Sequence, residues 1–487
     1  MRLITRCGTS SAEHSRQAAA LNTAARSRYR RRASRPHLVV LCVAGATLAA
    51  CHSATPPNIV LYVVDTLRFD ALHCDGNTTV QTPAMDRMAR EGTRFERAYA
   101  NASWTRASMG SLLTGEYPTV HGAVGRPDAL QPDLKTLAAQ LRARGYRTAA
   151  IIANPNIGST FGFASGFDEF IELYQPHPSR QPVRPEQLIA TATEVVDRAG
   201  EWLAHNTATP FFLLLFTIDP HAPYTPPTPY NTRYDADYQG TVDGSFKSLF
   251  GLAMLGKTPP EREIRHLRAL YDGEVAFNDA QLGRLLTTLD GRRLADSTLV
   301  VLAADHGEEF WEHGARDHGH TLFEELIHVP LIMRWPAAIP AGRVLGQPVQ
   351  LADVYPTLIQ LAGGTSAPGA GHDLSALLTR LGPGASPTAP VFAEEDLDGH
   401  QLAAVIAGSR KLIIDKARSA PLAFDLAHDP GELHPLPDGA PDLQSTLQAV
   451  EARNLAARPA AAARVDVPET VRDAMKALGY GDPDTHP

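Results

Sequence analysis

The fold is decided by the stretch Asn58-Ile-Val-Leu-Tyr-Val-Val64, which is hydrophobic after its first residue and runs directly into Asp65. Two further stretches, 210–216 and 298–304, are equally hydrophobic and also lead into polar residues. Short runs of valine, leucine, isoleucine and phenylalanine indicate strands that are buried on both faces of a parallel sheet. The sequence therefore predicts a central sheet to which these three strands belong.

The residues that follow the three runs include carboxylates and imidazoles, the side chains that bind metals: Asp65, Asp219, His221, Asp305 and His306. In open sheets of parallel strands, ligands bind at the carboxyl ends of the strands. Because those ends lie along one edge of the sheet, we expect these side chains to come together there. This convergence alone predicts a functional site.

Helical periodicity fills the intervals between the hydrophobic runs. Helices are expected at 82–92, 134–144, 186–206 and 260–290, and a further strand is expected at 147–152. Strands that alternate with helices predict an α/β fold with a mostly parallel sheet.

Beyond residue 365 the composition changes to glycine- and proline-rich linkers with short strand-like pieces at 401–407, 410–415 and 421–426. These pieces predict a small antiparallel sheet. We expect the chain to divide into a leader over 1–50, a catalytic domain over 56–365, a C-terminal subdomain over 366–435 and a helical tail over 436–487.

The leader has the pattern of a secretion signal. An arginine-rich stretch, 26–35, precedes an apolar run, 38–50, that is shorter than the roughly 20 apolar residues a membrane-spanning helix needs. Leu48-Ala-Ala-Cys51 resembles the lipobox of bacterial lipoproteins, in which the cysteine carries lipid. We expect an exported protein, anchored to the cell envelope through Cys51 and facing the periplasm or the cell surface. The alternative is an ordinary signal peptide with a chance cysteine.

Net charge and cysteine content agree with export. Residues 1–50 contain nine arginines and one glutamate, so removing this charge of +8 changes the net charge from −8 to −16. An acidic protein of this kind is not expected to bind nucleic acid generally. After residue 50 only Cys51 and Cys74 remain, so no intramolecular disulfide is available once Cys51 carries lipid.

The segment Asn101-Ala-Ser-Trp-Thr-Arg-Ala-Ser-Met-Gly-Ser-Leu-Leu-Thr-Gly-Glu-Tyr-Pro118 resembles the active-site segment of sulfatases. Their pattern is Cys/Ser-x-Pro-x-Arg, followed by a helix that carries Leu-Leu-Thr-Gly. Alignment on that helix places Thr105 at the nucleophile. Further matches follow in order from Asp65 to Glu432. The resemblance implies an alkaline-phosphatase-like α/β/α sandwich with a small C-terminal antiparallel sheet.

Threonine departs from the sulfatase pattern in a way that changes the chemistry. Sulfatases of the main type convert cysteine or serine at this position into formylglycine, which threonine cannot form, so no formylglycine is expected. Ala107 replaces the proline of the pattern and Met109 its arginine. Threonine at this position resembles phosphodiesterases and phosphoglycerol or phosphoethanolamine transferases of the wider alkaline phosphatase superfamily. Arg106 is a candidate substrate-binding residue in place of the missing guanidinium, and a solvated side chain is the alternative.

A threonine hydroxyl is a weak nucleophile that needs a metal or a base to activate it. Ser103 is expected to cap the following helix, which would place Thr105 at the helix N-terminus, where the dipole favours an anionic ester. The alternative is that Thr105 only caps the helix.

The resemblance implies one divalent metal ion bound by Asp65, Thr105, Asp305 and His306. In related sequences two acidic residues often stand together at the first of these positions, but here Thr66 takes the second place. Oxygen ligands with one imidazole favour Mn²⁺ or Zn²⁺, and Ca²⁺ is possible. Such an ion would lower the pKa of the Thr105 hydroxyl.

Three histidines are candidates for contact with the ester. His221 lies in an Asp-Pro-His-x-Pro-Tyr turn, and the resemblance implies that it bonds the ester or protonates the leaving group. His318 matches a position that contacts the charged oxygens, and His320 is a further substrate-binding candidate. A second metal site that uses Asp219 and His221 is the alternative to a single ion.

We therefore expect a metal-dependent hydrolase of sulfuric or phosphoric esters that works through a covalent intermediate on Thr105. Its substrate would be a small molecule or an ester of a glycan or lipid. The alternatives are a phosphoglycerol or phosphoethanolamine transferase and a non-catalytic binding protein on the same fold.

Overall fold

The computed structural model describes residues 56–175, 189–366, 369–379, 389–418 and 420–480. The predicted leader over 1–50 and the predicted lipid site at Cys51 lie outside these residues. The described residues belong to one compact unit. Among them, no helix has both the length and the apolar character that crossing a membrane requires.

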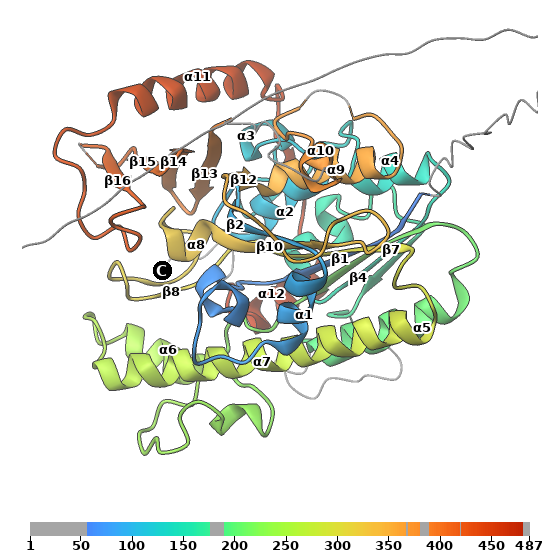
Figure 1. Cartoon of the computed structure of the whole chain (residues 1–487). Coiled ribbons are helices and arrows are strands. Elements are labelled where there is room, and N and C mark those ends of the chain that lie inside the picture. The colour runs from blue at the N-terminus through green and yellow to red at the C-terminus, as the bar shows by residue number, and fades with distance from the viewer. Residues whose placement is uncertain (1–55, 176–188, 367–368, 380–388, 419, 481–487) are drawn as a thin grey trace, which may run out of the picture. The chain divides into compact units, whose positions relative to one another are not determined.

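A nine-stranded sheet forms the centre of this unit (Figure 1). Along the sheet the order is β11-β2-β10-β7-β1-β6-β4-β5, with β12 also paired to β2. Neighbouring strands are parallel except at β10, which runs antiparallel to both β2 and β7. The strands are β1 (Asn58–Val64), β2 (Thr93–Tyr99), β4 (Arg147–Ile152), β5 (Glu169–Glu172), β6 (Phe211–Thr217), β7 (Thr298–Ala304), β10 (His328–Arg334), β11 (Arg343–Leu345) and β12 (Val349–Gln350). The predicted mostly parallel sheet is confirmed.

The three hydrophobic runs of the sequence form β1, β6 and β7, and β1 lies between the other two. Val64, the last residue of β1, is level with Thr217 of β6 and with Ala304 of β7. The residues that follow these strands therefore start from the same edge of the sheet. This register is what brings the predicted site residues together.

Helices cover both faces of the sheet. Figure 1 shows α1, α5 and α7 on one side of the sheet and α2, α4, α9 and α10 on the other. The helices of this part of the chain are α1 (Pro83–Glu91), α2 (Thr105–Thr114), α3 (Pro118–His121), α4 (Leu137–Arg142), α5 (Ala192–His205), α6 (Phe246–Ala253), α7 (Glu261–Gly291), α8 (Glu324–Ile327), α9 (Val354–Leu361) and α10 (Ser375–Thr379). The predicted α/β sandwich is confirmed.

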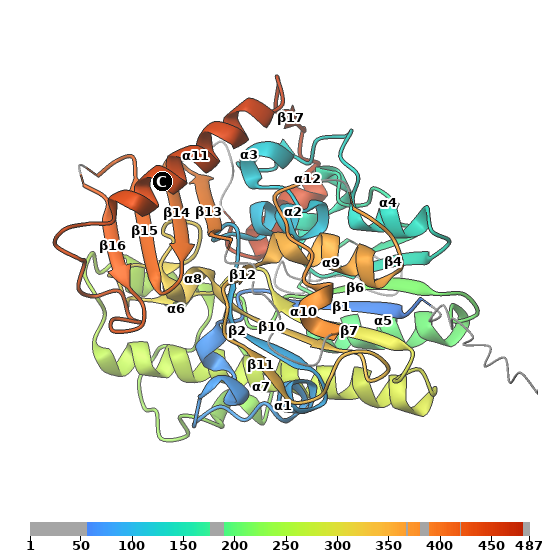
Figure 2. The same cartoon turned by 45° about the horizontal axis from the view of Figure 1, so that its top comes forward.

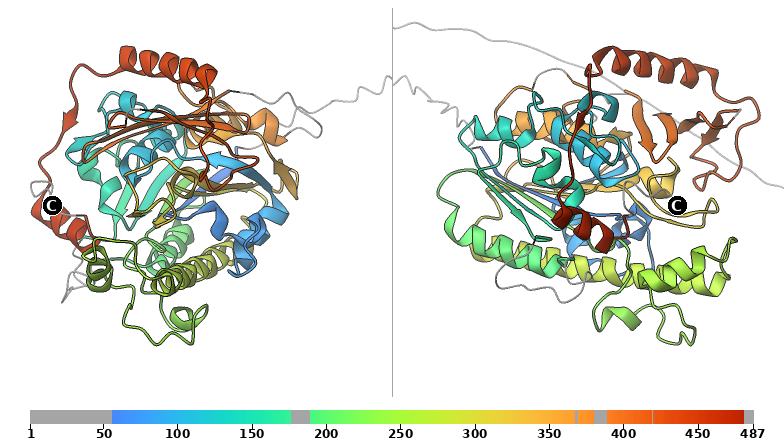
Figure 3. Two further views of the ribbon diagram at one scale, coloured as in Figure 1. Left: turned by 90° about the vertical axis from the view of Figure 1, so that its left-hand side faces the viewer. Right: turned by 180° about the vertical axis from the view of Figure 1, so that it is seen from behind.

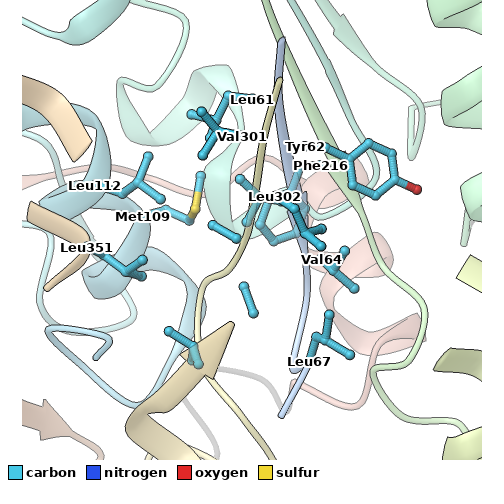
Figure 4. Close-up of a cluster of buried hydrophobic side chains, with 14 of the residues drawn as sticks. Leu61, Tyr62, Val64, Leu67, Met109, Leu112, Phe216, Val301, Leu302 and Leu351 are labelled. Atoms are coloured by element: carbon cyan, nitrogen blue, oxygen red, sulfur yellow. The ribbon is translucent and has the colours of Figure 1, made fainter. Parts of the chain in front are cut away.

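The core forms where α2 packs on the sheet. Figure 4 shows Met109 and Leu112 of α2 on the side to which Leu61 and Val301 point, whereas Tyr62 points to the other side. There the Tyr62 hydroxyl donates to Oδ1 of Asn278 in α7, at 2.8 Å. Burying one side chain of the size of leucine or methionine contributes about 1.5–3 kcal/mol to the free energy of unfolding. The packing fixes α2, and with it the predicted nucleophile, against the strand ends.

A separate four-stranded antiparallel sheet follows in the sequence (Figure 2). Its strands are β13 (Val391–Leu397), β14 (His400–Ala407), β15 (Arg410–Asp415) and β16 (Leu422–Asp425). Helix α11 (Pro441–Ala457) packs on it through Leu443 and Leu447, which share a buried cluster with Phe392 and Val405. The predicted antiparallel sheet is present, with β13 as an additional strand.

After α11 the chain returns to the large sheet. Figure 3 (right) shows it passing from α11 to α12 (Glu469–Ala477). On the way β17 (Ala463–Arg464) pairs with β3 (Asp128–Ala129), and a second short pair is made by β8 (Glu309–Phe310) and β9 (Arg316–Asp317). The described part of the tail therefore packs on the main unit, where Val471 and Met475 of α12 join the core.

A buried ion cluster joins the small sheet to the rest of the unit. Nζ of Lys411 in β15 lies 3.0 Å from a carboxylate oxygen of Glu324 in α8 and 3.0 Å from one of Glu432. Lys411 and Glu432 are fully buried. One cation thus compensates two carboxylates in a dry environment.

We expect Lys411→Met to destabilise the fold by about 3–5 kcal/mol, because it leaves the buried Glu432 carboxylate without a cation and removes one of the two basic partners of Glu324. Urea unfolding followed by circular dichroism measures this loss. The control is Lys416→Met, a substitution at an exposed lysine nearby. Equal losses in the two variants would contradict a stabilising role for the buried cluster.

Candidate active site

Four side chains from three elements converge at the edge of the sheet: Asp65 after β1, Asp305 and His306 after β7, and Thr105 at the start of α2. Nε2 of His306 lies 3.2 Å from the Thr105 hydroxyl, 3.7 Å from Oδ1 of Asp65 and 3.4 Å from Oδ2 of Asp305. All four residues are fully buried. The residues predicted to bind a metal are therefore together.

The two carboxylates each keep one oxygen without a partner. Oδ1 of Asp65 and Oδ2 of Asp305 are buried and make no hydrogen bond. Burial raises the pKa of Asp305 to about 7, and burial together with the Asp305 charge raises that of Asp65 well above its usual value. An orphaned buried carboxylate oxygen is costly unless a cation faces it. These groups fit a divalent ion.

The other atoms of the cluster are held in place by hydrogen bonds. Nδ2 of Asn154 donates to Oδ2 of Asp65 at 2.7 Å. The backbone N–H groups of Thr66 and His306 donate to Oδ1 of Asp305 at 3.2 and 2.9 Å. Nδ1 of His306 lies 2.9 Å from a carbonyl oxygen, so it carries the proton and leaves the lone pair on Nε2 facing the cluster. The free lone pairs are thus directed at one another, as in a metal shell.

Thr105 is the first residue of α2, and Trp104 precedes it as the N-cap. The first N–H groups of a helix have no intrahelical acceptor, so this end favours an anion. Ser103 does not cap the helix as predicted. Its hydroxyl instead donates to Oε2 of Glu395 at 2.8 Å, and this buried carboxyl has its pKa raised to about 8 by burial.

Arg106 has a structural role in this structure. Its guanidinium is buried, donates to Oδ1 of Asn156 at 2.9 Å and to the carbonyl oxygens of Gly125, Arg126 and Asp128, and lies over the Phe161 ring. These donors are engaged by the protein rather than free for a substrate, which differs from the prediction.

Met109, at the pattern's arginine position, is fully buried in the apolar core (Figure 4). With Arg106 engaged elsewhere, neither residue brings a guanidinium to the cluster. Positive charge beyond that of a bound ion would therefore have to come from another side chain.

His318 is the candidate source of positive charge beside the cluster. Its Nδ1 lies 3.1 Å from Oε1 of Glu308 and 3.0 Å from Oδ1 of Asp317. Burial alone would lower its pKa, but these two carboxylates outweigh burial and raise the pKa well above its usual value. The His318 ring lies beside that of His306, with centroids 4.4 Å apart and the ring planes tilted by 40°. A charged imidazole therefore borders the cluster.

His221 lies next to His318, with ring centroids 5.1 Å apart. Its Nδ1 is 2.6 Å from the carbonyl oxygen of Ala222, so Nδ1 donates, and Nε2 is 3.0 Å from the Tyr480 hydroxyl. Burial and the His318 charge lower the pKa of His221 to about 4. At neutral pH its Nε2 therefore accepts a hydrogen bond from Tyr480.

Two other predicted residues lie in separate contacts. Nε2 of His320 pairs with Oε2 of Glu309 at 2.9 Å, and Oδ2 of Asp219 accepts from the backbone N–H of Ala192 at 2.7 Å, at the start of α5. Within the described part of the chain, two residue groups have metal-ligand spacing: Asp65, Asp305 and His306, and Glu308, Asp317 and His318. Asp219 is in neither, and the second group is accounted for by its ion pairs.

Sequence reasoning missed several residues of the site. Asn154 follows β4, so the strand-end argument applied to the predicted strand 147–152 would have found it. Glu308 and Asp317 lie within the histidine-rich segment but have no pattern that assigns them to His318. Tyr480 carries no sequence signal, because it reaches the site only through the return of the tail.

The sequence of this chain matches a known protein family. The family described as Sulfatase matches residues 57–364. Steryl-sulfatase of Mus musculus is 28% identical, over 86% of this chain and 86% of its own length. N-acetylglucosamine-6-O-sulfatase of Bacteroides thetaiotaomicron is 26% identical, over 68% of this chain and 73% of its own length.

Solved structures share the fold. The phosphonate monoester hydrolase of Agrobacterium radiobacter superposes with a TM-score of 0.67 at 22% identity, covering 82% of this chain and 95% of its own. A protein solved in complex with its substrate D-glucosamine-2-N,6-O-disulfate superposes with a TM-score of 0.66 at 20% identity, covering 88% and 99%. At these identities the superpositions establish the fold alone.

We expect the purified protein to contain one divalent metal ion per chain and His306→Ala to lose it, since the variant lacks the only nitrogen of the cluster. Elemental analysis by mass spectrometry measures the ratio. His320→Ala is the matched control, because that histidine pairs with Glu309 away from the cluster. Metal retained by His306→Ala and lost by His320→Ala would reverse the assignment.

Proposed function

The chain belongs to the sulfatase family of ester hydrolases, and from this we propose that it hydrolyses a sulfate or phosphate ester through a covalent ester on Thr105. The observation that carries the proposal is the Thr105 hydroxyl, 3.2 Å from Nε2 of His306, at a helix N-terminus and beside two carboxylates with orphaned oxygens. A hydroxyl in this position is placed for nucleophilic attack.

A divalent ion held by Asp65, Thr105, Asp305 and His306 would supply the charge that lowers the pKa of the Thr105 hydroxyl. Members of the family generally bind such an ion. The two carboxylates and one imidazole suit Mn²⁺ or Zn²⁺ better than Ca²⁺, which prefers an all-oxygen shell. Because threonine cannot become formylglycine, we propose that the hydroxyl itself is the nucleophile.

The reaction has two steps. The Thr105 oxygen bonds to sulfur or phosphorus while the bond to the alcohol oxygen breaks, and the proton given up by the Thr105 hydroxyl leaves on the alcohol. Water then attacks the threonine ester, which restores the hydroxyl and releases inorganic sulfate or phosphate. The N–H groups at the start of α2 stabilise the negative charge of the transferring group in both steps.

His318 is the proposed cationic contact of the ester. Its charge is maintained by Glu308 and Asp317, and it lies beside the ring of His306. A cation there stabilises the oxygens that gain charge in the transition state. His221, neutral at Nε2, is then a hydrogen-bond acceptor for the leaving alcohol rather than its proton donor.

Membership of the sulfatase family indicates a broad class of substrate. The relatives include a steryl-sulfatase and an N-acetylglucosamine-6-O-sulfatase, and the structural neighbours include a phosphonate monoester hydrolase. We propose a small-molecule or glycan ester. The leader pattern ending at Cys51 supports an exported enzyme attached to the cell envelope by lipid.

Thr105→Ala is expected to lower kcat by at least about 10³-fold, because the nucleophile is removed, whereas Thr105→Ser keeps a hydroxyl and part of the activity. Hydrolysis of nitrophenyl sulfate, nitrophenyl phosphate and a bis-nitrophenyl phosphodiester measures this and ranks the ester classes. Unchanged turnover in Thr105→Ala would rule out the proposed intermediate.

His318→Ala is expected to lower kcat/KM by roughly 10²-fold, because a charge facing the ester is lost. His318→Lys restores a cation and should recover part of the activity on the same substrates. If lysine is no better than alanine at this position, then charge is not what His318 contributes.

A further inference from the structure

The proposed nucleophile is closed off from solvent. Thr105, Asp65, Asp305 and His306 are all fully buried, and the side chains of His221 and His318 are nearly so. An ester can react only if its sulfur or phosphorus reaches the Thr105 oxygen. Some covering group must therefore move when a substrate enters.

Tyr480 is a covering group that is borne by the tail. Its ring lies beside His221, with centroids 5.5 Å apart, and beside His318, with centroids 6.3 Å apart. Its hydroxyl is 3.0 Å from Nε2 of His221. The same hydroxyl also contacts Thr105 and Asn154. A tyrosine hydroxyl is protonated at neutral pH, so it can donate to Nε2 of His221.

The tail holds this tyrosine in place by packing and by a tight turn. Val471 and Met475 of α12 are buried in the main core, and the N–H of Tyr480 donates to the carbonyl oxygen of Met475 at 3.0 Å. Gly479 has a φ of 82°, and a Cβ there would lie 2.6 Å from the ring of Phe246 in α6. A glycine is therefore required for the tail to approach this closely.

The hydroxyl of Tyr480 takes the place of a substrate oxygen. Nε2 of His221 is the atom proposed to face the leaving alcohol, and a phenol already occupies it. A phenol is itself an alcohol on a six-membered ring. A bound product alcohol would make the same hydrogen bond, so Tyr480 and the alcohol compete for one position.

We propose that Tyr480 is a gate and specificity residue of the active site: its phenol fills the leaving-alcohol position beside His221 and Thr105, and a substrate enters by displacing it. The alcohol-mimicking part of this inference rests on the proposed function, whereas the closing of the site rests on the burial and the contacts alone. The space that the phenol vacates fits an alcohol carrying one six-membered ring. Tyr480 would thereby favour esters of ring alcohols, which replace its contacts with the two histidines.

Displacement is feasible because the hydroxyl is held by polar contacts that a substrate can replace. The hydroxyl lies 3.0 Å from Nε2 of His221 and also contacts Thr105 and Asn154, while the tail is held mainly through α12. Breaking one such bond changes an opening equilibrium by only about fivefold. The side chain can therefore move without release of α12.

Accessibility of position 105 tests the gate without any assay of turnover. In full-length protein carrying Thr105→Cys, alkylation of the peptide containing position 105 by iodoacetamide is followed by mass spectrometry. We expect Tyr480→Ala in this background to raise the rate at least about tenfold and Tyr480→Phe to raise it about fivefold, because the first removes ring and hydroxyl and the second the hydroxyl alone. Equal rates with and without Tyr480→Ala would overturn the gate.

The matched control is Asp473→Asn, at an exposed residue of α12, which should leave the alkylation rate unchanged. Amide hydrogen exchange of 469–477 checks that α12 stays folded in each variant. If α12 unfolds in Tyr480→Ala, Tyr480→Phe decides: a faster rate with α12 intact supports the gate, and an unchanged rate overturns it.

Orthovanadate, a tetrahedral oxyanion, separates this inference from the proposed function. In the Thr105→Cys, Tyr480→Ala protein, protection of the thiol by orthovanadate supports an oxyanion site beneath the gate. Faster alkylation without protection supports the gate and contradicts the oxyanion site. Protection without faster alkylation contradicts the gate and supports the oxyanion site.

Discussion

The site depends on two carboxylates that the sheet forces together in a dry environment. Asp65 and Asp305 follow adjacent parallel strands whose last residues are level, so their positions are set by the backbone rather than by the side chains. Each keeps one oxygen without a hydrogen-bond partner. Such a pair is stable only if a cation faces it or if it takes up protons. The remaining features of the site can be understood as responses to this negative charge.

Three features of the site are directed at the negative charge of Asp65 and Asp305. The lone pair of His306 faces the carboxylates because its other nitrogen donates to a backbone carbonyl. The start of α2 directs the positive end of a helix dipole towards the same point. His318 adds a charge that Glu308 and Asp317 maintain, since they counteract the effect of burial on its pKa. Together these groups support the proposed binding of an anion whose charge grows during reaction.

The sequence predicted the parts of this site that follow from local pattern. Hydrophobic runs of seven residues specified β1 and β7 to the residue, and the strand-end rule then located the proposed metal ligands. The rule says nothing about charged strands, and β2 was missed because Thr93-Arg-Phe-Glu-Arg-Ala-Tyr99 mixes charge with apolar residues. The partners of Ser103 and Arg106 could not be predicted either, because these partners lie on other segments of the chain, such as the one that carries Glu395. Tyr480 is the extreme case, bonded to a histidine 259 residues away.

The departures at Thr105 and Met109 from the sulfatase pattern are compatible with the other residues of the site. An arginine at position 109 would place a charge in what is here the apolar packing between α2 and the sheet, and Met109 instead fills that space. The positive charge is supplied from the other side, by His318 on the segment after β7. A threonine hydroxyl needs strong activation, and His306 places its unprotonated Nε2, a hydrogen-bond acceptor, 3.2 Å from it. Together, Thr105, His306, Met109 and His318 support our proposal of an active site in which a side-chain hydroxyl takes the place of formylglycine.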